Sequence, residues 1–124
     1  MAKILIIDDD DNLRDMLADL FFSLDPEHTV ETAKDGVEGV LAAKRLLPDL
    51  VVTDVEMPKM TGHEVCKKLK EDPATAGIPI LMLTGANDLD SALGGLGCGA
   101  DDHITKPFDL DEVAARAQAL LRAK

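Results

Sequence analysis

The 124-residue sequence is poor in aromatic residues, in cysteine and in basic residues. It has no Trp, no Tyr and only three Phe, so its core must be packed from Leu, Ile, Val, Ala and Met. Its 13 basic residues stand against 24 acidic ones, and the net charge of −11 argues against direct binding to nucleic acid or to an anionic membrane surface. No apolar run approaches the roughly 20 residues that a membrane-spanning helix needs. We therefore expect an acidic protein that binds neither nucleic acid nor membranes.

The two cysteines, Cys66 and Cys98, fit neither a metal-binding nor a redox spacing. This usage is typical of a reducing compartment, so we expect the protein in the cytoplasm. We expect no signal peptide, because residues 1–3 lead directly into a predicted strand. A chain of this length is expected to fold as one domain over residues 1–124.

Short aliphatic runs alternate with helical patterns along the whole chain. The runs at residues 4–7, 50–53 and 80–83 are typical of parallel strands buried on both faces, and weaker strands are predicted at 29–33 and 103–105. Apolar residues recur every three or four positions in five segments, which predict helices around residues 13–24, 37–47, 65–69, 89–96 and 110–121. Asp11 or Asn12 is placed to cap the first helix, and Pro48 ends the second. Five such alternations predict an α/β fold, a doubly wound three-layer sandwich with a five-stranded parallel sheet and five helices.

Polar residues with useful chemistry follow four of the five predicted strands. In open parallel sheets, ligands bind beyond the carboxyl ends of the strands. The second strand ends in Ala33-Lys34, where we expect nothing comparable. The residues at the other four strand ends are the acidic run 8–11, Asp54, Thr84 and Lys106-Pro107. The fold would bring these groups to one edge of the sheet.

The expected cluster has a charge balance that indicates a metal ion. Asp8, Asp9 and Asp54 carry three negative charges, and at least one of them would stay protonated without compensation. One divalent cation and Lys106 would supply three positive charges. Ligands that are all oxygen, in a half-open site, suit Mg²⁺. A carboxylate beside Mg²⁺, a Lys and the Thr84 hydroxyl is suited to phosphoryl transfer, with Asp54 as the nucleophile.

This set of residues resembles the receiver (phosphoacceptor) domain of bacterial two-component response regulators, and is similar to the single-domain chemotaxis-type regulators. Met57-Pro58, Gly62 and the segment 99–102 support the resemblance, which runs from Lys3 to about Leu121. It implies a flavodoxin-like fold with the strand order 2-1-3-4-5. It also implies that Asp54 accepts a phosphoryl group from a histidine of a sensor kinase or phosphotransfer protein.

The resemblance implies further roles for single residues. Asp9 is expected to bind Mg²⁺ directly and Asp8 directly or through water, with the backbone carbonyl of Glu56 as a further ligand. Lys106 is expected to pair first with the Asp54 carboxylate and then with the phosphoryl group. The bond between Lys106 and Pro107 is expected to be cis.

The resemblance also implies a switch. Thr84 is expected to move toward a phosphoryl oxygen, with His103 turning inward behind it. The face made by the fourth strand, fourth helix, fifth strand and fifth helix would then report phosphorylation to a partner or output domain. Such a protein catalyses only its own phosphorylation and dephosphorylation, so we do not expect an enzyme.

Several alternatives stay open on the sequence alone. The acidic run also allows Asp9 and Asp10 to be the metal-binding pair, and His103 can be an exposed strand residue without a role. A small Mg²⁺-dependent phosphatase with an aspartate nucleophile uses similar groups, although such enzymes carry the nucleophile on the first strand. The chain could also be a scaffold receiver that is never phosphorylated. A flavin-binding protein of this fold is set aside, because the sequence has no Trp or Tyr to stack on the ring.

Overall fold

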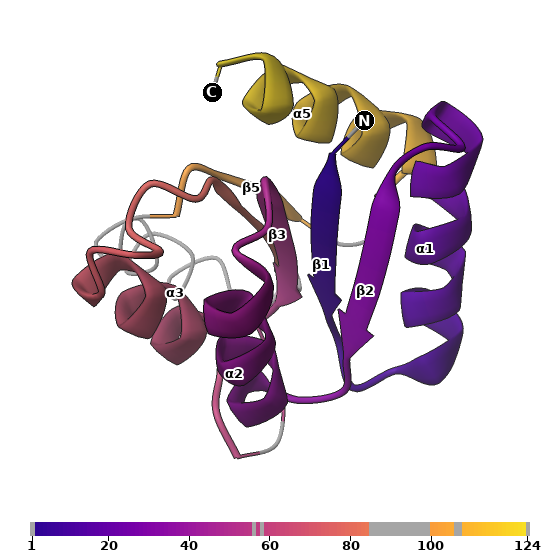
Figure 1. The fold of residues 1–124 in the computed structure, drawn as a ribbon. Coiled ribbons are helices and arrows are strands. Elements are labelled where there is room, and N and C mark those ends of the chain that lie inside the picture. The colour runs from indigo at the N-terminus through magenta and orange to yellow at the C-terminus, as the bar shows by residue number, and fades with distance from the viewer. Residues whose placement is uncertain (1, 56, 58, 85–99, 106–107, 124) are drawn as a thin grey trace.

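The structure of the protein, a computed structural model, describes residues 2–55, 57, 59–84, 100–105 and 108–123. Strands and helices alternate along the chain (Figure 1). The elements are β1 (Lys3–Ile7), α1 (Asp11–Leu24), β2 (Thr29–Ala33), α2 (Gly36–Leu46), β3 (Leu50–Asp54), α3 (Gly62–Glu71), β4 (Ile80–Thr84), β5 (Asp102–Thr105) and α5 (Leu110–Ala123). The helix predicted around residues 89–96 lies outside the described residues.

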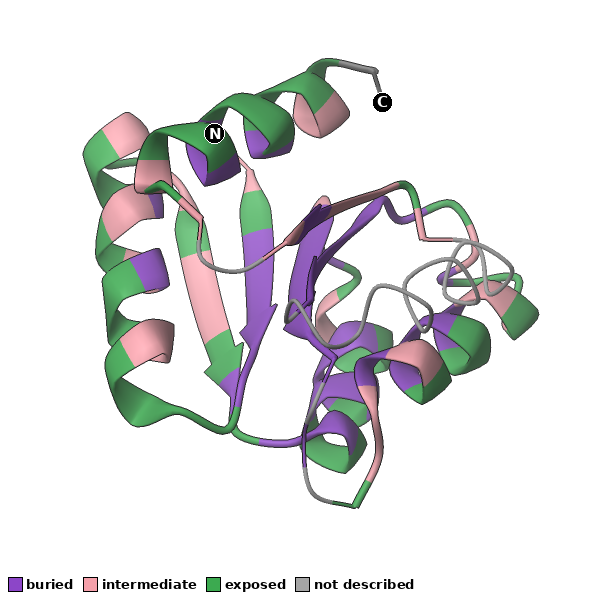
Figure 2. Ribbon diagram, turned by 180° about the vertical axis from the view of Figure 1, so that it is seen from behind, coloured by how far each residue is buried: buried purple, intermediate pink, exposed green. Residues whose placement is uncertain are grey.

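The strands form one parallel sheet in the order β2-β1-β3-β4-β5, which confirms the predicted fold class and strand order. The three central strands are the ones that the aliphatic runs predicted, and nearly all of their residues are buried (Figure 2). The edge strand β2 is more exposed, with only Ala33 buried.

Helices cover both faces of the sheet and make three layers. Along β1, Ile4 and Ile6 face one side and Leu5 and Ile7 face the other, because successive side chains of a strand point to opposite faces. The first side packs against α1 and α5, and its buried core includes Leu17, Phe21, Val113 and Ala117. The second side packs against α2 and α3, and its core includes Val40, Ala43, Val65 and Leu69. Among the described residues, no helix has the length and apolar character needed to cross a membrane.

The cap of α1 is Asp10, one residue before the predicted cap. Its carboxylate Oδ1 accepts hydrogen bonds from the N–H groups of Asn12, at 2.9 Å, and Leu13, at 3.3 Å. The prediction of Asp11 or Asn12 was therefore wrong by at least one position. In a run of four acidic residues the spacing does not distinguish the cap. The backbone decides it, since Asp10 has the extended conformation of a cap residue and the helix begins at Asp11.

Helix α2 turns a different face to the sheet than its large apolar residues suggest. Val37, Leu41 and Leu47 are 41%, 65% and 50% exposed. The buried positions are mostly small ones: Gly36, Gly39, Val40, Ala42 and Ala43. A Cβ atom on Gly39 would lie 2.5 Å from Cδ1 of Ile7, so α2 packs too closely on β1 for larger side chains. Close packing thus overrides the periodicity of the larger residues.

Candidate functional site

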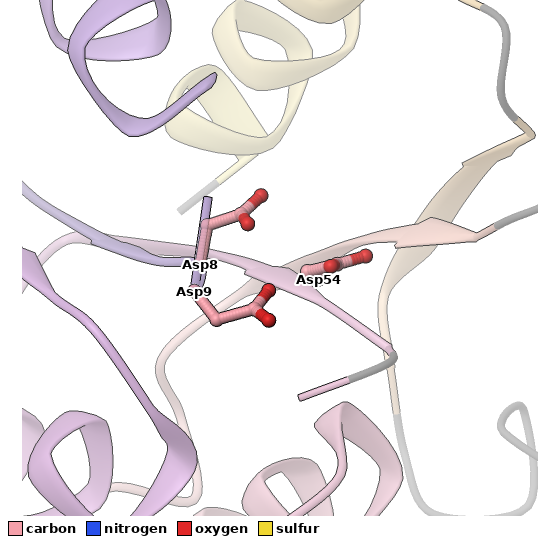
Figure 3. Close-up of side chains that lie close together, drawn as sticks. All are labelled: Asp8, Asp9 and Asp54. Atoms are coloured by element: carbon pink, nitrogen blue, oxygen red, sulfur yellow. The ribbon is translucent and has the colours of Figure 1, made fainter. Parts of the chain in front are cut away.

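The site is built where β1 and β3, neighbours in the sheet, end at the same edge. The register pairs Ile7 with Thr53, so the next residues, Asp8 and Asp54, leave the two strands side by side. Figure 3 shows the side chains of Asp8, Asp9 and Asp54 reaching toward a common space from the end of β1 and the end of β3. The predicted convergence of these three carboxylates is therefore present in the structure.

The carboxylate cluster is compact and mostly buried. One oxygen from each of Asp8, Asp9 and Asp54 lies within 4.8 Å of the others. Asp8 is 1% and Asp54 6% exposed, whereas Asp9 is exposed. In an octahedral Mg²⁺ site the oxygen ligands lie about 2.9 Å apart when adjacent and about 4.2 Å apart when opposite, since each is 2.0–2.1 Å from the metal. The donor set is therefore suited to a hard divalent cation on which the three carboxylates close, and the cation would relieve the repulsion between them.

Hydrogen bonds fix the positions of the two buried aspartates, Asp8 and Asp54. Asp8 Oδ1 accepts from the N–H of Asp10 at 2.9 Å, and the Asp8 backbone carbonyl accepts from Arg14 Nη1 at 2.9 Å. Asp54 Oδ1 accepts from the N–H of Val55 at 2.9 Å. Since the carboxylate of Asp10 caps α1, it is Asp8 and Asp9 that approach Asp54, and the alternative pair of Asp9 and Asp10 has no support in the structure.

The start of α3 packs directly behind Asp54. Thr61 and Glu64 form a capping box, with Thr61 Oγ1 accepting from the Glu64 N–H at 3.2 Å and Glu64 Oε1 accepting from the Thr61 N–H at 3.1 Å. The N–H of Gly62 donates to the carbonyl of Val55 at 2.8 Å. The Asp54 carbonyl lies against Gly62 and accepts from the buried hydroxyl of Thr53 at 3.0 Å. The backbone around Asp54 is thus held from both the strand and the helix.

Thr84 and His103 lie on the strands beyond β3. Thr84 ends β4 and is fully buried, and its hydroxyl donates to the carbonyl of Ile104 at 3.4 Å. His103 lies on β5 opposite Met82, is partly exposed, and donates its backbone N–H to Asp102 Oδ1 at 2.8 Å. Thr84 therefore ends β4, which is the neighbour of the strand that carries Asp54. Its hydroxyl bonds to Ile104, the residue after His103. Three further predicted site residues, Glu56, Lys106 and Pro107, lie outside the described residues.

A fourth carboxylate, Asp35, lies just past the end of β2, where we expected nothing comparable. It is 5% exposed, caps α2 by accepting from the Glu38 N–H at 2.8 Å, and lies 3.6 Å from Lys59 Nζ in the loop after β3. The hydrogen bond from Glu38 lowers the pKa of Asp35 below its ordinary value, burial opposes this shift, and Lys59 adds to it. The position of Asp35 just before a predicted helix could have indicated that it caps the helix. The ion pair of Asp35 with Lys59, in contrast, depends on the fold.

Comparison with known proteins identifies the family. The profile described as the response regulator receiver domain matches residues 4–118. The DNA-binding dual master transcriptional regulator RpaA of Synechocystis is 43% identical over 123 residues, which cover 98% of this chain and 50% of RpaA. Response regulator MprA of a Mycobacterium species is 42% identical over 122 residues, covering 98% of this chain and 51% of MprA. The chemotaxis response regulator CheY4 of Vibrio cholerae has a TM-score of 0.87 at 33% identity, covering 97% of this chain and 98% of CheY4.

The chain belongs to the response regulator receiver domain family. Receiver domains of two-component response regulators are signalling switches rather than classical enzymes, and they are phosphorylated on an aspartate. They bind Mg²⁺ through acidic residues and interact with histidine kinases and output domains. The chain spans about half the length of the curated relatives it matches. The family predicted from the strand-end residues is therefore confirmed.

Proposed function

We propose that this chain accepts a phosphoryl group on Asp54 from a histidine of a sensor kinase or of a phosphotransfer protein. The observation that carries the proposal is the position of Asp54, which is buried on β3 between the acidic pair on one side and Thr84 on the other. An Asp54 carboxylate oxygen forms the new O–P bond while the P–N bond of the phosphohistidine breaks and returns its electron pair to the imidazole. No redox step is involved.

We propose that Asp8, Asp9 and Asp54, together with the backbone carbonyl of Glu56, hold Mg²⁺. The spacing of the three carboxylates supports this assignment for the aspartates, and the resemblance to receiver domains supports it for Glu56. When bound, Mg²⁺ supplies positive charge that offsets the negative oxygens of the transferred group. Asp8 is fixed by its hydrogen bond to Asp10 and so needs little rearrangement to bind the ion.

We assign the remaining positions from the family resemblance. Lys106 pairs with the Asp54 carboxylate and then with the phosphoryl group, and the bond to Pro107 is cis. Thr84 moves toward a phosphoryl oxygen, which requires its hydroxyl to leave the Ile104 carbonyl. That bond is long, at 3.4 Å, so its loss costs little. The movement of Thr84 makes room for His103, in the adjacent strand, to turn inward.

In this proposal the protein is a switch with no substrate other than its own aspartate. The face formed by β4, β5, α5 and the predicted helix between β4 and β5 presents the result to an output protein or domain. The acidic surface of the chain supports partners other than nucleic acid, so DNA binding by a longer relative such as RpaA would belong to its other half. We place the reaction in the cytoplasm, because Cys66 and Cys98 fit neither a metal-binding nor a redox spacing, a usage typical of a reducing compartment.

Intact mass spectrometry tests the assignment of Asp54. Incubation with Mg²⁺ and a small acyl phosphate should add one PO₃ group, and the Asp54→Asn variant should gain none. Asp19→Asn, an equal charge change on the exposed side of α1, should be phosphorylated like the wild type. An adduct that persists in Asp54→Asn would disprove the assignment. A wild-type protein that never forms an adduct would support the scaffold alternative, and repeated turnover of an added phosphomonoester would support the phosphatase alternative.

A further inference from the structure

The outer edge of β2 exposes backbone groups that could pair with another strand. β2 is the first strand in the sheet order, so on its far side no described strand pairs with it. The Thr29 N–H donates to the Ala2 carbonyl at 2.8 Å, and the Ala33 carbonyl accepts from the Asp8 N–H at 3.1 Å, so residues 29, 31 and 33 turn their backbone groups toward β1. Because these directions alternate along a strand, Val30 and Thr32 turn their N–H and C=O groups outward.

A groove runs beside this edge, between β2 and α2. Its volume is about 270 Å³, several times the roughly 30 Å³ that one water molecule occupies. The lining residues are Glu31, Thr32, Glu38, Leu41, Ala42 and Arg45. Glu31 and Thr32 are consecutive and point to opposite faces of the strand, so the groove reaches over the edge itself. Its apolar wall is Leu41, which at 65% is the most exposed large hydrophobic residue among those described.

The charge of the groove selects the kind of segment that fits it. Two carboxylates, Glu31 and Glu38, face one guanidinium, Arg45, which forms an ion pair with Glu31. A second copy of this chain carries a net charge of −11 and would set its own acidic residues against these two, which is unfavourable. A basic segment is attracted to the same residues.

We propose that the groove between β2 and α2 is a docking site for an extended, basic segment of a partner protein. The segment pairs with the outward backbone groups of Val30 and Thr32 as a sixth strand, places an aliphatic side chain against Leu41, and directs a basic side chain toward Glu38. Backbone pairing supplies affinity in this mode of recognition, and the side-chain pocket supplies specificity. The acidic residues also restrict pairing with other strands, as charged residues at sheet edges commonly do. This inference goes beyond the proposed phosphoryl transfer, because it uses none of the residues assigned to that reaction.

Hydrogen exchange measured by NMR on the ¹⁵N-labelled full chain tests the pairing. The probe is a synthetic peptide of about seven residues in which valine and lysine take turns along one face of the strand and serine occupies the other face, long enough to match one strand. We expect the N–H groups of Val30 and Thr32 to become protected, while the N–H of Glu31, which points toward β1, keeps its rate. The same peptide with glutamate in place of lysine should leave all three unchanged.

Two variants, one in α2 and one just after it, test the groove. Leu41→Lys places a positive charge in the apolar wall and should weaken peptide binding by roughly tenfold or more, about 1.4 kcal/mol per factor of ten. Leu47→Lys makes the same change at an exposed residue of the same segment that does not line the groove, and should bind like the wild type. Both positions are on the surface, so folding is preserved.

The edge itself is tested with Thr32→Pro, which removes an outward N–H without removing a bond to β1 and should also weaken binding. Three results would overturn the proposal. The first is equal binding by the Leu41→Lys and Leu47→Lys variants, and the second is protection spread over Asp8 and Asp9 without the alternation at β2. The third is concentration-dependent self-association that protects Val30 and Thr32 without peptide, which would make a second copy the occupant.

Discussion

Gly62, at the start of α3, lies directly against the backbone carbonyl of Asp54, at the end of β3. A Cβ atom on residue 62 would stand 2.3 Å from that oxygen and 2.9 Å from Cα of Val55. Both neighbours are backbone atoms, which cannot move aside as a flexible side chain can. The absence of a side chain at residue 62 therefore sets how closely α3 approaches the strand that carries Asp54.

Replacing Gly62 with Ala should destabilise the protein and slow its phosphorylation. The added methyl group must push α3 away from β3 or displace the Asp54 backbone, and overpacking of this kind costs about 1–3 kcal/mol. Urea denaturation measures the loss in the free energy of unfolding, and the initial rate of phosphorylation by an acyl phosphate measures the effect on Asp54.

Gly77 provides the matched control for this substitution. It lies in an exposed turn, and a Cβ atom there would meet nothing within 4 Å. Gly77→Ala should leave the phosphorylation rate unchanged and leave stability unchanged or raise it by less than about 1 kcal/mol. Equal losses of stability in the two variants would show that the contact between Gly62 and Asp54 is not the cause.

Mg²⁺ should stabilise the wild type, and the Asp54→Asn variant should respond much less. Binding to the folded state alone raises the free energy of unfolding, by about 2.7 kcal/mol when free Mg²⁺ is a hundred times its Kd. Without metal, Asp54→Asn should melt at a higher temperature than the wild type, because it removes one charge from a crowded, largely buried trio. Thermal melts in EDTA and in excess Mg²⁺ measure both effects.

Asp19→Asn, on the exposed side of α1, is the control for general charge effects. It should show the wild-type response to Mg²⁺. A metal-dependent shift of the same size in Asp54→Asn would mean that Mg²⁺ binds elsewhere.

The central strands and the carboxylate cluster are the features that the sequence predicted best. The strands β1, β3 and β4 are buried on both faces, so each appears in the sequence as an unbroken aliphatic run. Such a run can be recognised without knowing how the strand pairs with its neighbours. The cluster followed because parallel strands bring their carboxyl ends to one edge, which places Asp8 and Asp54 together although they are far apart in the chain.

The features that the sequence missed depend on contacts between distant segments. The apolar residues of the segment 37–47 predicted the helix but not which of its faces is buried. The close approach of Gly39 to Ile7 turns the small residues inward and leaves Val37 and Leu41 exposed. The ion pair of Asp35 with Lys59 joins the start of α2 to the loop after β3 and has no local sequence signal. Such pairings are decided by how the helices pack, which composition and spacing do not encode.

Leu47 should be a site where glycine stabilises the protein. It follows α2 with φ 50° and ψ 62°, a left-handed conformation that a residue with a Cβ atom adopts at a cost of about 1–2 kcal/mol. Leu47→Gly removes this cost, loses little packing because the side chain is half exposed, and increases the entropy of the unfolded chain. We expect a net gain of about 0.5–1 kcal/mol in urea denaturation. Leu41→Gly, in the exposed interior of the same helix, should instead lose about 1 kcal/mol, and a loss in both variants would contradict the explanation.

The contribution of Asp35 to stability should depend on pH. Because the pKa of Asp35 is lowered in the folded state, the unfolded chain binds a proton more readily, and acid favours unfolding. The contribution is therefore fully present above the ordinary value of 3.8 and is lost as the pH falls through the lower folded pKa.

Asn caps a helix about as well as Asp, so Asp35→Asn removes the charge and keeps the cap. Urea denaturation from about pH 7 to about pH 3 should show wild type more stable than Asp35→Asn at neutral pH, with the difference shrinking only below the ordinary carboxyl pKa. A difference that stays constant across this range would mean that the carboxylate charge, held by the Glu38 N–H and Lys59, does not stabilise the start of α2.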